Sequence, residues 1–210
     1  MGMPGAGKGT QASLLRDSCA VPHISTGDIL REAVREGSAL GQRVKGILES
    51  GQLVPDELMQ ELIVERLGKS DAQSGFILDG FPRTAEQVTM LDTVMEQLGI
   101  DLDGVYLLGA PEEEIVRRLS GRRVCPGCTS VFHLETKPPT SAGVCDGCGS
   151  ALVQRPDDTE AVIRDRIRLY NEQTHPIAET YRARGLLVEV DASGSPESVA
   201  ERLTGAVKVS

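Results

Sequence analysis

The first ten residues contain a glycine-rich segment whose spacing suits phosphate binding. It reads Gly2-Met3-Pro4-Gly5-Ala6-Gly7-Lys8-Gly9-Thr10, and it matches the pattern glycine, any four residues, glycine, lysine. Such glycines let successive backbone N–H groups face one anion, and the helix expected from Gly9 to Arg16 points its positive end at that anion. Lys8 adds a mobile positive charge, so the segment is expected to bind nucleotide phosphates. A disordered glycine-rich terminus is the alternative, and a helix directly behind the loop disfavours it.

The segment departs from the usual pattern in two ways. A serine or threonine normally follows the lysine and holds Mg²⁺, whereas Gly9 stands here and Thr10 comes next. A phosphate loop also normally follows a buried strand, and only Met1 precedes Gly2. We expect either a true start upstream or a sheet that lacks its interior first strand. We favour the upstream start, because a missing central strand leaves hydrogen bonds of its two neighbours unmade.

Four of the five cysteines form two pairs with the spacing of a zinc site. Cys125 and Cys128 form one pair, Cys145 and Cys148 form the other, and 16 residues separate them. Two tight turns at this spacing can place four thiolates around one tetrahedral Zn²⁺, leaving no open position, so the expected metal is structural. Disulfides are the first alternative, which a reducing compartment disfavours, and a nucleic-acid-binding zinc ribbon is the second. Cys19 stands alone and is expected to be a buried apolar residue.

Composition indicates an ordinary globular protein that handles small phosphates. The chain has 210 residues, of which 40% are hydrophobic and 25% are charged, which excludes a disordered or collagen-like chain. A net charge of −9 and an aromatic content of 3% disfavour binding to a nucleic-acid backbone. Arginine, which grips phosphate in two places, outnumbers lysine 17 to 5. No stretch reaches the roughly 20 apolar residues of a membrane helix, and no secretory leader is visible, so a cytoplasmic location is expected.

Short apolar runs alternate with helical patterns along most of the chain. This alternation predicts an α/β fold, with a parallel sheet flanked by helices. Two polar segments, 25–54 and 121–158, interrupt it and are expected to be insertions, the first helical and without a strand. The expected strands lie at 76–78, 105–108 and 187–190, with a weaker one at 21–24. One helix is expected to open with Pro55, Asp56 and Glu57 and to end before Gly68, a second to span about 86–98 with Gly99 as its C-terminal stop, and a third to start at Pro196 with Ser195 as N-cap.

Five motifs in the same order give the sequence a resemblance to the adenylate kinases. The first is the loop itself, and the others are Ser25–Asp28 with Arg31, Gly51–Glu57, Asp79–Arg83 with Gln87, and Gly121–Arg123 followed by the cysteines. The resemblance covers essentially the whole chain except the missing first strand. It implies the P-loop nucleoside monophosphate kinase fold in its long bacterial form. The implied parts are a core at 1–24, 55–120 and 159–210, a nucleoside-monophosphate insert at 25–54 and a zinc-binding lid at 121–158.

The resemblance also implies an activity and a set of site residues. The activity is reversible phosphoryl transfer from ATP to AMP, giving two ADP, which serves adenine nucleotide homeostasis, with Mg²⁺ and in a monomer. The implied catalytic residues are Lys8, Asp79, Arg83, Arg122, Arg155 and Arg166. Those implied for ATP are Gly5, Ala6, Gly7, Lys8, Gly9, Thr10, Arg118, Arg122, Val131, Phe132 and Gly194. Those implied for AMP are Thr26, Arg31, Gln52, Leu53, Val54, Gly80, Phe81, Pro82, Arg83, Gln87, Arg155 and Arg166.

The chemistry of these residues is consistent with that activity. Transfer between two phosphates gathers several negative charges, so catalysis consists mostly of charge neutralisation and alignment, which separated arginines can supply. Asp79 ends an apolar strand and is expected to hold waters around Mg²⁺, although a plain turn residue is the alternative. A kinase for another nucleoside monophosphate remains open, and so does a P-loop switch protein with a zinc ribbon. The switch protein would hydrolyse ATP slowly and regardless of AMP.

Overall fold

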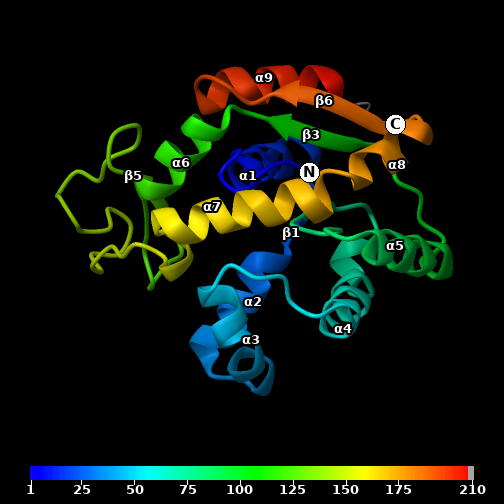
Figure 1. Ribbon diagram of the computed structural model, residues 1–210, viewed down its shortest axis with the longest axis horizontal. Helices are drawn as coiled ribbons and strands as arrows, with labels where there is room; N and C mark the ends of the chain where they lie inside the picture. Colours follow the sequence, from blue (N-terminus) through cyan, green and yellow to red (C-terminus); the bar gives the residue numbers. More distant parts are fainter. Residues whose placement is uncertain (208–210) are drawn as a thin grey trace.

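The computed structural model describes residues 1–207, in which helices and strands alternate as the sequence predicts (Figure 1). The strands are β1 (His23–Ser25), β2 (Ile77–Asp79), β3 (Val105–Gly109), β4 (Arg122–Val124), β5 (Val131–His133) and β6 (Leu187–Asp191). The α-helices are α1 (Lys8–Cys19), α2 (Thr26–Glu36), α3 (Ala39–Glu49), α4 (Asp56–Leu67), α5 (Ala85–Leu98), α6 (Glu112–Ser120), α7 (Glu160–Leu169), α8 (Ile177–Ala183) and α9 (Pro196–Ala206). Short helical turns lie at η1 (Ser70–Ala72) and η2 (Pro156–Asp158), and the wider turn η3 (Tyr170–Thr174) follows α7.

All four strands expected from the apolar runs are present, within one or two residues of the expected bounds. Ser25 is a correction, because it ends β1 instead of opening the helical segment. Its hydroxyl still accepts a hydrogen bond from the Asp28 N–H at 3.3 Å and caps α2. Ser195 caps α9 in the expected way, and Gly99 ends α5 in the left-handed conformation with φ 67°. Local capping chemistry thus accounts for these helix ends.

The parallel strands form two separate pairs among residues 1–207. β1 pairs with β2, with His23 opposite Ile77, and β3 pairs with β6, with Val105 opposite Leu187. On the edge of β3 opposite β6, Gly2 forms a single parallel bridge with Leu108. The α/β class with parallel strands is confirmed, but these strands do not join into one sheet.

Each strand pair has its own apolar core. Around β1 and β2 pack residues of α4 and α5, among them the fully buried Ile63 and Leu91. Around β3 and β6 pack residues of α1, α6, α7 and α9, among them Ile115, Ile163 and Leu203. Figure 1 shows α9 along β3 and β6 on one side, while α2 and α3 form a lobe on the opposite side.

The two polar segments fold as projections from these cores. Helices α2 and α3 pack against each other within the first segment. In the second segment, β4 and β5 form an antiparallel pair, with Arg122 opposite His133. Long loops with almost no helix or strand complete this second projection, which extends beyond α6 in Figure 1. Within the described part of the chain, none of the helices is long and apolar enough to cross a membrane.

The contact between α2 and α3 depends on the glycine at position 41. A β-carbon at Gly41 would lie 2.0 Å from the Ala33 carbonyl oxygen, whereas one at Gly46 on the same helix would meet nothing within 4 Å. Gly41→Ala should therefore lower the free energy of unfolding of this lobe by about 1 to 3 kcal/mol through overpacking. Gly46→Ala is the matched control, and it should be neutral or stabilising by up to about 1 kcal/mol. Urea unfolding followed by circular dichroism measures both, and equal effects would contradict the close approach.

Candidate active site and metal centre

The glycine-rich loop closes tightly around the side chain of its lysine. Gly5 and Gly7 have φ values of 85° and 90°, and Gly7 directly precedes α1. A β-carbon at Gly5 would lie 2.8 Å from the Leu119 side chain, so only glycine fits there. The Lys8 Nζ donates hydrogen bonds to the carbonyl oxygens of Gly2 and Met3 at 2.7 and 2.8 Å. Burial is the main cause that lowers the pKa of Lys8 to about 8.

Asp79 lies at the carboxyl end of β2 and faces this lysine. Burial alone would raise the pKa of Asp79, but the His23 side chain and the positive charge of Lys8 lower it to about 2. The His23 Nε2 lies 3.6 Å from the Asp79 carboxylate, and both side chains are nearly buried. The residue is therefore ionised in the neutral range and is able to hold a hydrated cation.

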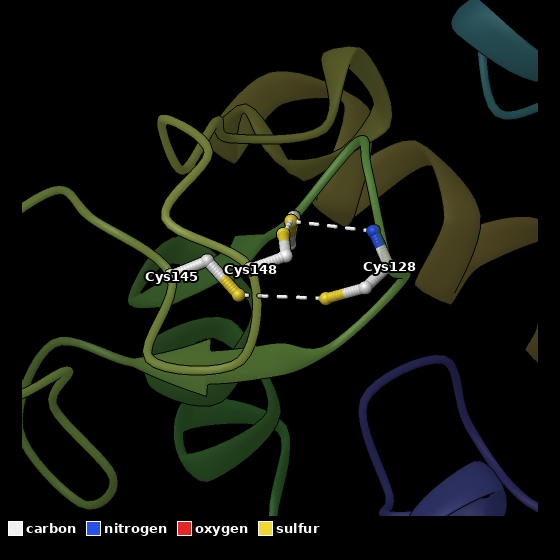
Figure 2. A group of neighbouring side chains, drawn as sticks. Cys128, Cys145 and Cys148 are labelled. Carbon is white, nitrogen blue, oxygen red and sulfur yellow. Dashed lines mark hydrogen bonds between the residues drawn. The ribbon is translucent and has the colours of Figure 1, made fainter.

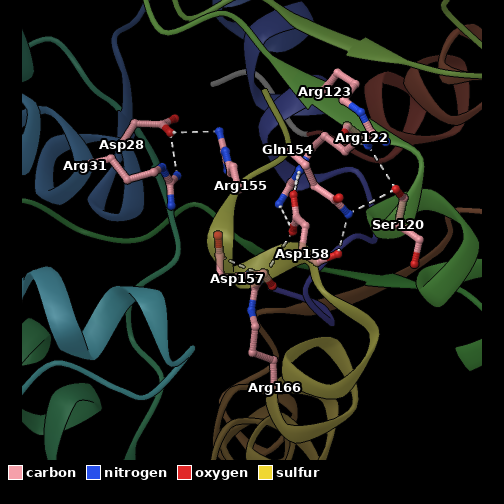
Figure 3. A network of polar contacts seen from close by, with 10 residues as sticks. All are labelled: Asp28, Arg31, Ser120, Arg122, Arg123, Gln154, Arg155, Asp157, Asp158 and Arg166. Carbon is pink, nitrogen blue, oxygen red and sulfur yellow. Dashed lines mark hydrogen bonds and ion pairs between the residues drawn. The ribbon is translucent and has the colours of Figure 1, made fainter. Parts of the chain in front are cut away.

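Four charged residues at the start and base of the second projection form a largely buried network (Figure 3). Arg122 donates two hydrogen bonds to the Asp158 carboxylate, at 2.8 and 2.6 Å, and this carboxylate is completely buried. The Arg166 Nη1 lies 2.8 Å from the carboxylate of Asp157 and 3.4 Å from that of Asp158. Each guanidinium has five N–H donors, so both retain donors for a ligand.

Further guanidinium groups join the network from three other segments. Arg155 lies 3.8 Å from the Asp28 carboxylate, which also accepts a hydrogen bond from Arg31 at 2.5 Å. Burial, followed by repulsion from neighbouring arginines, lowers the pKa of Arg155 and of Arg83 to about 10. Desolvated positive charges that repel one another favour an anion between them, so this arrangement is suited to phosphate.

The segment after β2 is held in place by backbone and amide contacts. The Phe81–Pro82 peptide bond is cis. The Arg83 Nε donates to the Gly80 carbonyl oxygen at 2.7 Å, while the Arg83 N–H donates to the Gln87 Oε1 at 2.8 Å. The Gln87 Nε2 donates to the Asp56 carboxylate at 2.6 Å, so this amide is engaged within the protein although one of its N–H groups stays available.

The residues expected to bind nucleotides line two adjoining cavities. The larger has a volume of about 2600 Å³ and runs between the loop, the carboxyl ends of the strands and both projections. The smaller, of about 60 Å³, lies against α2 and the start of α4. The larger is lined by Gly5, Ala6, Gly7, Lys8, Gly9, Thr10, Arg31, Leu53, Asp79, Gly80, Phe81, Pro82, Arg83, Arg118, Arg122, Val131, Phe132, Arg155, Arg166 and Gly194. The smaller adds Thr26, Gln52, Val54 and Gln87. The structure therefore brings every expected nucleotide-binding residue to one continuous region.

Some of these residues have roles within the protein as well. Phe132 is 7% exposed and packs with Cys125 and Cys145, so its ring belongs to the small core of the second projection. Val131, its neighbour, is 43% exposed. Arg118 donates to the Ala192 carbonyl oxygen at 2.9 Å, close to the expected Gly194.

The carboxylates that position the arginines were not expected from the sequence. Asp157 and Asp158 hold Arg166 and Arg122, and Asp28 holds Arg31 and Arg155. The sequence does hold one indication of Asp157 and Asp158, because this acidic pair directly follows Arg155 and Pro156. Nothing in the spacing alone separates such carboxylates from ordinary surface acids.

The four paired cysteines meet at one point, as their spacing predicts. Their Sγ atoms all lie within 4.8 Å of one another, and those of Cys125 and Cys145 are on buried residues. Figure 2 shows the Cys128 and Cys145 sulfurs facing each other, at 3.4 Å. Cys19, expected to be buried, is a correction, because it is only half-buried near the end of α1. Four thiols in this compact set fit a tetrahedral metal ion with thiolate ligands.

The two cysteine turns have the same internal hydrogen bonds. The Cys125 N–H donates to the Ser130 carbonyl oxygen, and the Cys145 N–H donates to that of Ser150, each at 2.9 Å. The hydroxyls of the same serines lie 3.1 Å from the Cys128 Sγ and 3.4 Å from the Cys148 Sγ. These contacts lower the pKa of Cys128 to about 6 and also lower that of Cys148, whereas burial raises the pKa of Cys145 to about 11.

Comparisons with known proteins give one consistent family. The family model described as adenylate kinase matches residues 1–186. The adenylate kinase of Kosmotoga olearia is 49% identical over 203 residues, which cover 97% of this chain and 94% of that protein. The adenylate kinase of Methanocella arvoryzae is 45% identical over 207 residues, covering 99% and 96%. The adenylate kinase of Streptomyces griseus is 45% identical over 211 aligned residues, covering 100% and 96%.

The buried network gives a prediction about stability. Asp158→Ala should lower the free energy of unfolding by about 3 to 5 kcal/mol, because it leaves the partly buried Arg122 guanidinium without its carboxylate and removes one of the two carboxylates beside Arg166. The control is Glu172→Ala, which removes an exposed partner of Arg168 and should change stability by less than about 1 kcal/mol. Both are measured by urea unfolding at neutral pH. A loss below about 1 kcal/mol in Asp158→Ala would contradict the central role of this carboxylate.

Proposed function

The chain belongs to the adenylate kinase family and is an ATP:AMP phosphotransferase, and we propose that the loop and the arginines of its cleft bind and align the two nucleotides. The observation that carries this proposal is the convergence of Lys8, Arg83, Arg122 and Arg166 on the region around Asp79, where their charges influence one another. In-line transfer needs no covalent intermediate when charge neutralisation and alignment are supplied in this way.

On the donor side, the loop binds the phosphates of ATP. Its backbone N–H groups and the start of α1 face the phosphates, and the Lys8 ammonium moves from the carbonyls of Gly2 and Met3 to the β- and γ-phosphate oxygens. A bound phosphate stabilises the charged form of Lys8, because it offsets the desolvation that lowers the pKa of this group. The ribose and adenine of ATP lie farther along the larger cavity, whose lining includes Arg118, Arg122, Val131, Phe132 and Gly194.

On the acceptor side, AMP binds where the smaller cavity joins the larger one. Thr26, Gln52, Val54 and Gln87 line the smaller cavity, and Arg31, Arg83 and Arg166 lie where it opens into the larger cleft. The acceptor phosphate at this opening takes N–H donors from the arginines, which their carboxylate partners already hold in orientation. Arg122 and Arg166, fixed by Asp158, are then well placed to neutralise the group in transfer.

The cleft also fits a magnesium ion bound with the nucleotide. Asp79 supplies an ionised carboxylate beside the first turn of α1, where it would hold water ligands of the ion. When bound, Mg²⁺ would supply charge neutralisation at the phosphates. Gly9 occupies the position of the usual hydroxyl ligand.

The two projections act as an insert for the nucleoside monophosphate, at 25–54, and as a lid, at 121–158. The Arg35 Nη1 donates to the Pro126 carbonyl oxygen at 3.3 Å, a contact between the insert and a cysteine turn of the lid. This contact and the Arg155–Asp28 pair bring both projections over the cleft. Water is thereby excluded during transfer, which suppresses hydrolysis of ATP. All these groups belong to one chain, which is consistent with action as a monomer.

The cysteine cluster holds a structural Zn²⁺ in the lid. The four sulfurs supply a complete tetrahedral set, and the apolar core beside them consists only of Phe132 and Leu152 together with Cys125 and Cys145. The metal therefore contributes stability that the lid does not obtain from apolar burial. No step of the transfer involves it.

A coupled assay of ADP production tests the proposed roles. The chain should form ADP only when both ATP and AMP are present, with AMP preferred over UMP and CMP. Lys8→Ala should lower kcat by at least about 100-fold, because a charge that stabilises the transition state is lost. Lys45→Ala removes an exposed lysine from α3 and serves as the control, with unchanged kcat. ADP production independent of AMP, or equal rates in Lys8→Ala and Lys45→Ala, would refute these roles.

Removal of one cysteine tests the lid metal. Cys128→Ser should lower both the zinc content, from one ion per chain, and the melting temperature, because a tetrahedral site loses a thiolate. Cys19→Ser lies outside the cluster and should keep its zinc. Elemental analysis and thermal unfolding measure the two quantities. Full zinc content and an unchanged melting temperature in Cys128→Ser would show that the cluster is not a structural metal site.

A further inference from the structure

The chain between α7 and α8 forms one wide turn, η3, which the proline after it favours. The His175 N–H donates to the Tyr170 carbonyl oxygen at 2.8 Å, which lies five residues back instead of four. Pro176 follows directly and has no N–H, and a proline ring displaces the carbonyl oxygen four residues before it. The helical path therefore widens before Pro176 instead of continuing as a regular α-helix. Wide turns of this kind occur frequently at functional sites.

The last residue of this turn contacts a segment that is far away in the sequence. Thr174 is 8% exposed, and its hydroxyl donates a hydrogen bond to the Arg83 carbonyl oxygen at 3.0 Å. A threonine within a helix usually donates to a carbonyl oxygen one turn earlier, as the exposed Thr93 does with Thr89 at 3.0 Å. Thr174 instead joins η3 to the segment after β2, 91 residues earlier in the chain.

The backbone of Arg83 is held by side chains on both sides. Its N–H donates to the Gln87 Oε1 at 2.8 Å, and its carbonyl oxygen accepts the hydrogen bond from Thr174. The guanidinium Nε donates to the Gly80 carbonyl oxygen at 2.7 Å, so the side chain of Arg83 is also fixed. Gln87 lies on α5, which directly follows this segment, whereas Thr174 comes from another part of the fold. The Thr174 hydroxyl therefore sets where the Arg83 backbone lies relative to α7.

The same stretch of chain carries another arginine of the cleft. Arg166 lies on α7, which leads into η3, and its carboxylate partners are Asp157 and Asp158. Repulsion from Arg166 is the largest cause after burial that lowers the pKa of Arg83 to about 10. Two guanidinium groups that repel each other keep their places only when the protein anchors both of them. One continuous segment thus holds Arg166 directly and Arg83 through Thr174.

We propose that Thr174 is a positioning residue for the acceptor side of the reaction, and that its hydroxyl acts through the carbonyl oxygen of Arg83. This inference rests on the proposed binding of the acceptor phosphate by Arg83. Removal of the hydroxyl leaves the Arg83 carbonyl oxygen without this donor, so the backbone shifts and the guanidinium loses its alignment with the phosphate. The phosphate loop and Lys8 belong to other segments, so the loss concerns AMP and not ATP.

The test begins with the hydroxyl of Thr174 in the coupled assay of ADP production. Thr174→Val should raise KM for AMP by about threefold to tenfold and change KM for ATP by less than about twofold, because one hydrogen bond on the acceptor side is lost. Thr174→Ser restores the hydroxyl and should return KM for AMP to within about twofold of the unaltered chain. Thr93→Val is the matched control, because it removes an exposed hydroxyl bonded within its own helix, and both KM values should stay unchanged.

A second comparison shows whether Thr174 acts through Arg83. Arg83→Ala should weaken AMP binding, measured by titration, and Thr174→Val should add no further loss in that background, because no guanidinium is left to position. The NMR signal of the Arg83 Nε–H, assigned by its loss in Arg83→Lys, gives a readout without turnover. It should shift in Thr174→Val and keep its position in Thr93→Val.

Three outcomes would overturn the positioning role alone. They are an unchanged KM for AMP in Thr174→Val beside a weakened Arg83→Ala, equal rises of KM for ATP and AMP, and a Thr174→Ser variant as impaired as Thr174→Val. Additive losses in the double variant would also contradict it, because they mean that the Thr174 hydroxyl contacts the ligand itself. Unchanged AMP binding in Arg83→Ala is a different result, since it refutes the proposed role of Arg83 and removes the premise.

Discussion

The cleft depends on holding several positive charges close together. Guanidinium groups at this density repel one another, and burial lowers the pKa of Arg83 and Arg155 to about 10. Asp158, completely buried between Arg122 and Arg166, offsets part of that repulsion. Asp158 accepts hydrogen bonds from only some of the N–H donors of these two arginines. It therefore fixes the orientation of the guanidinium groups and leaves their other donors able to bind an anion. The carboxylates thus hold these guanidinium groups in orientations suited to anions, and fixed donors of this kind are a condition for electrostatic catalysis.

The two projections beside the cleft are held together by different physical means. The first projection uses two amphipathic helices in such close contact that a glycine is required at position 41. The second projection has few apolar residues and long loops, and it gathers four thiols at one point. Each cysteine turn repeats the same hydrogen bonds to Ser130 or Ser150, so the geometry of the thiols is determined locally. A small projection can therefore be stable without a core when a metal supplies the binding energy.

Motif and periodicity predicted much of this arrangement, and the failures have clear causes. The loop, the cysteine pairs and the strand at 105–108 were predictable because each depends on neighbouring residues. Asp158 was not, since its function depends on burial between arginines that lie far apart in the sequence. Cys19 was expected to be buried, but its position near the helix end leaves it half-exposed. Parallel strands were predicted correctly, and the two pairs lie apart where the sequence analysis expected the strand before Gly2 to be missing.

The contacts that hold the loop also bear on nucleotide binding. Among the described residues, the loop contacts the rest of the protein through Met1 and Gly2 against β3, through Gly5 against the Leu119 side chain, and through the packing of α1 against α9. Lys8 adds hydrogen bonds to the carbonyls of Gly2 and Met3. In the proposed binding mode the lysine turns to a phosphate and these bonds are lost, so the phosphate then contributes to the order of the loop. Nucleotide binding and loop order are therefore coupled under this proposal.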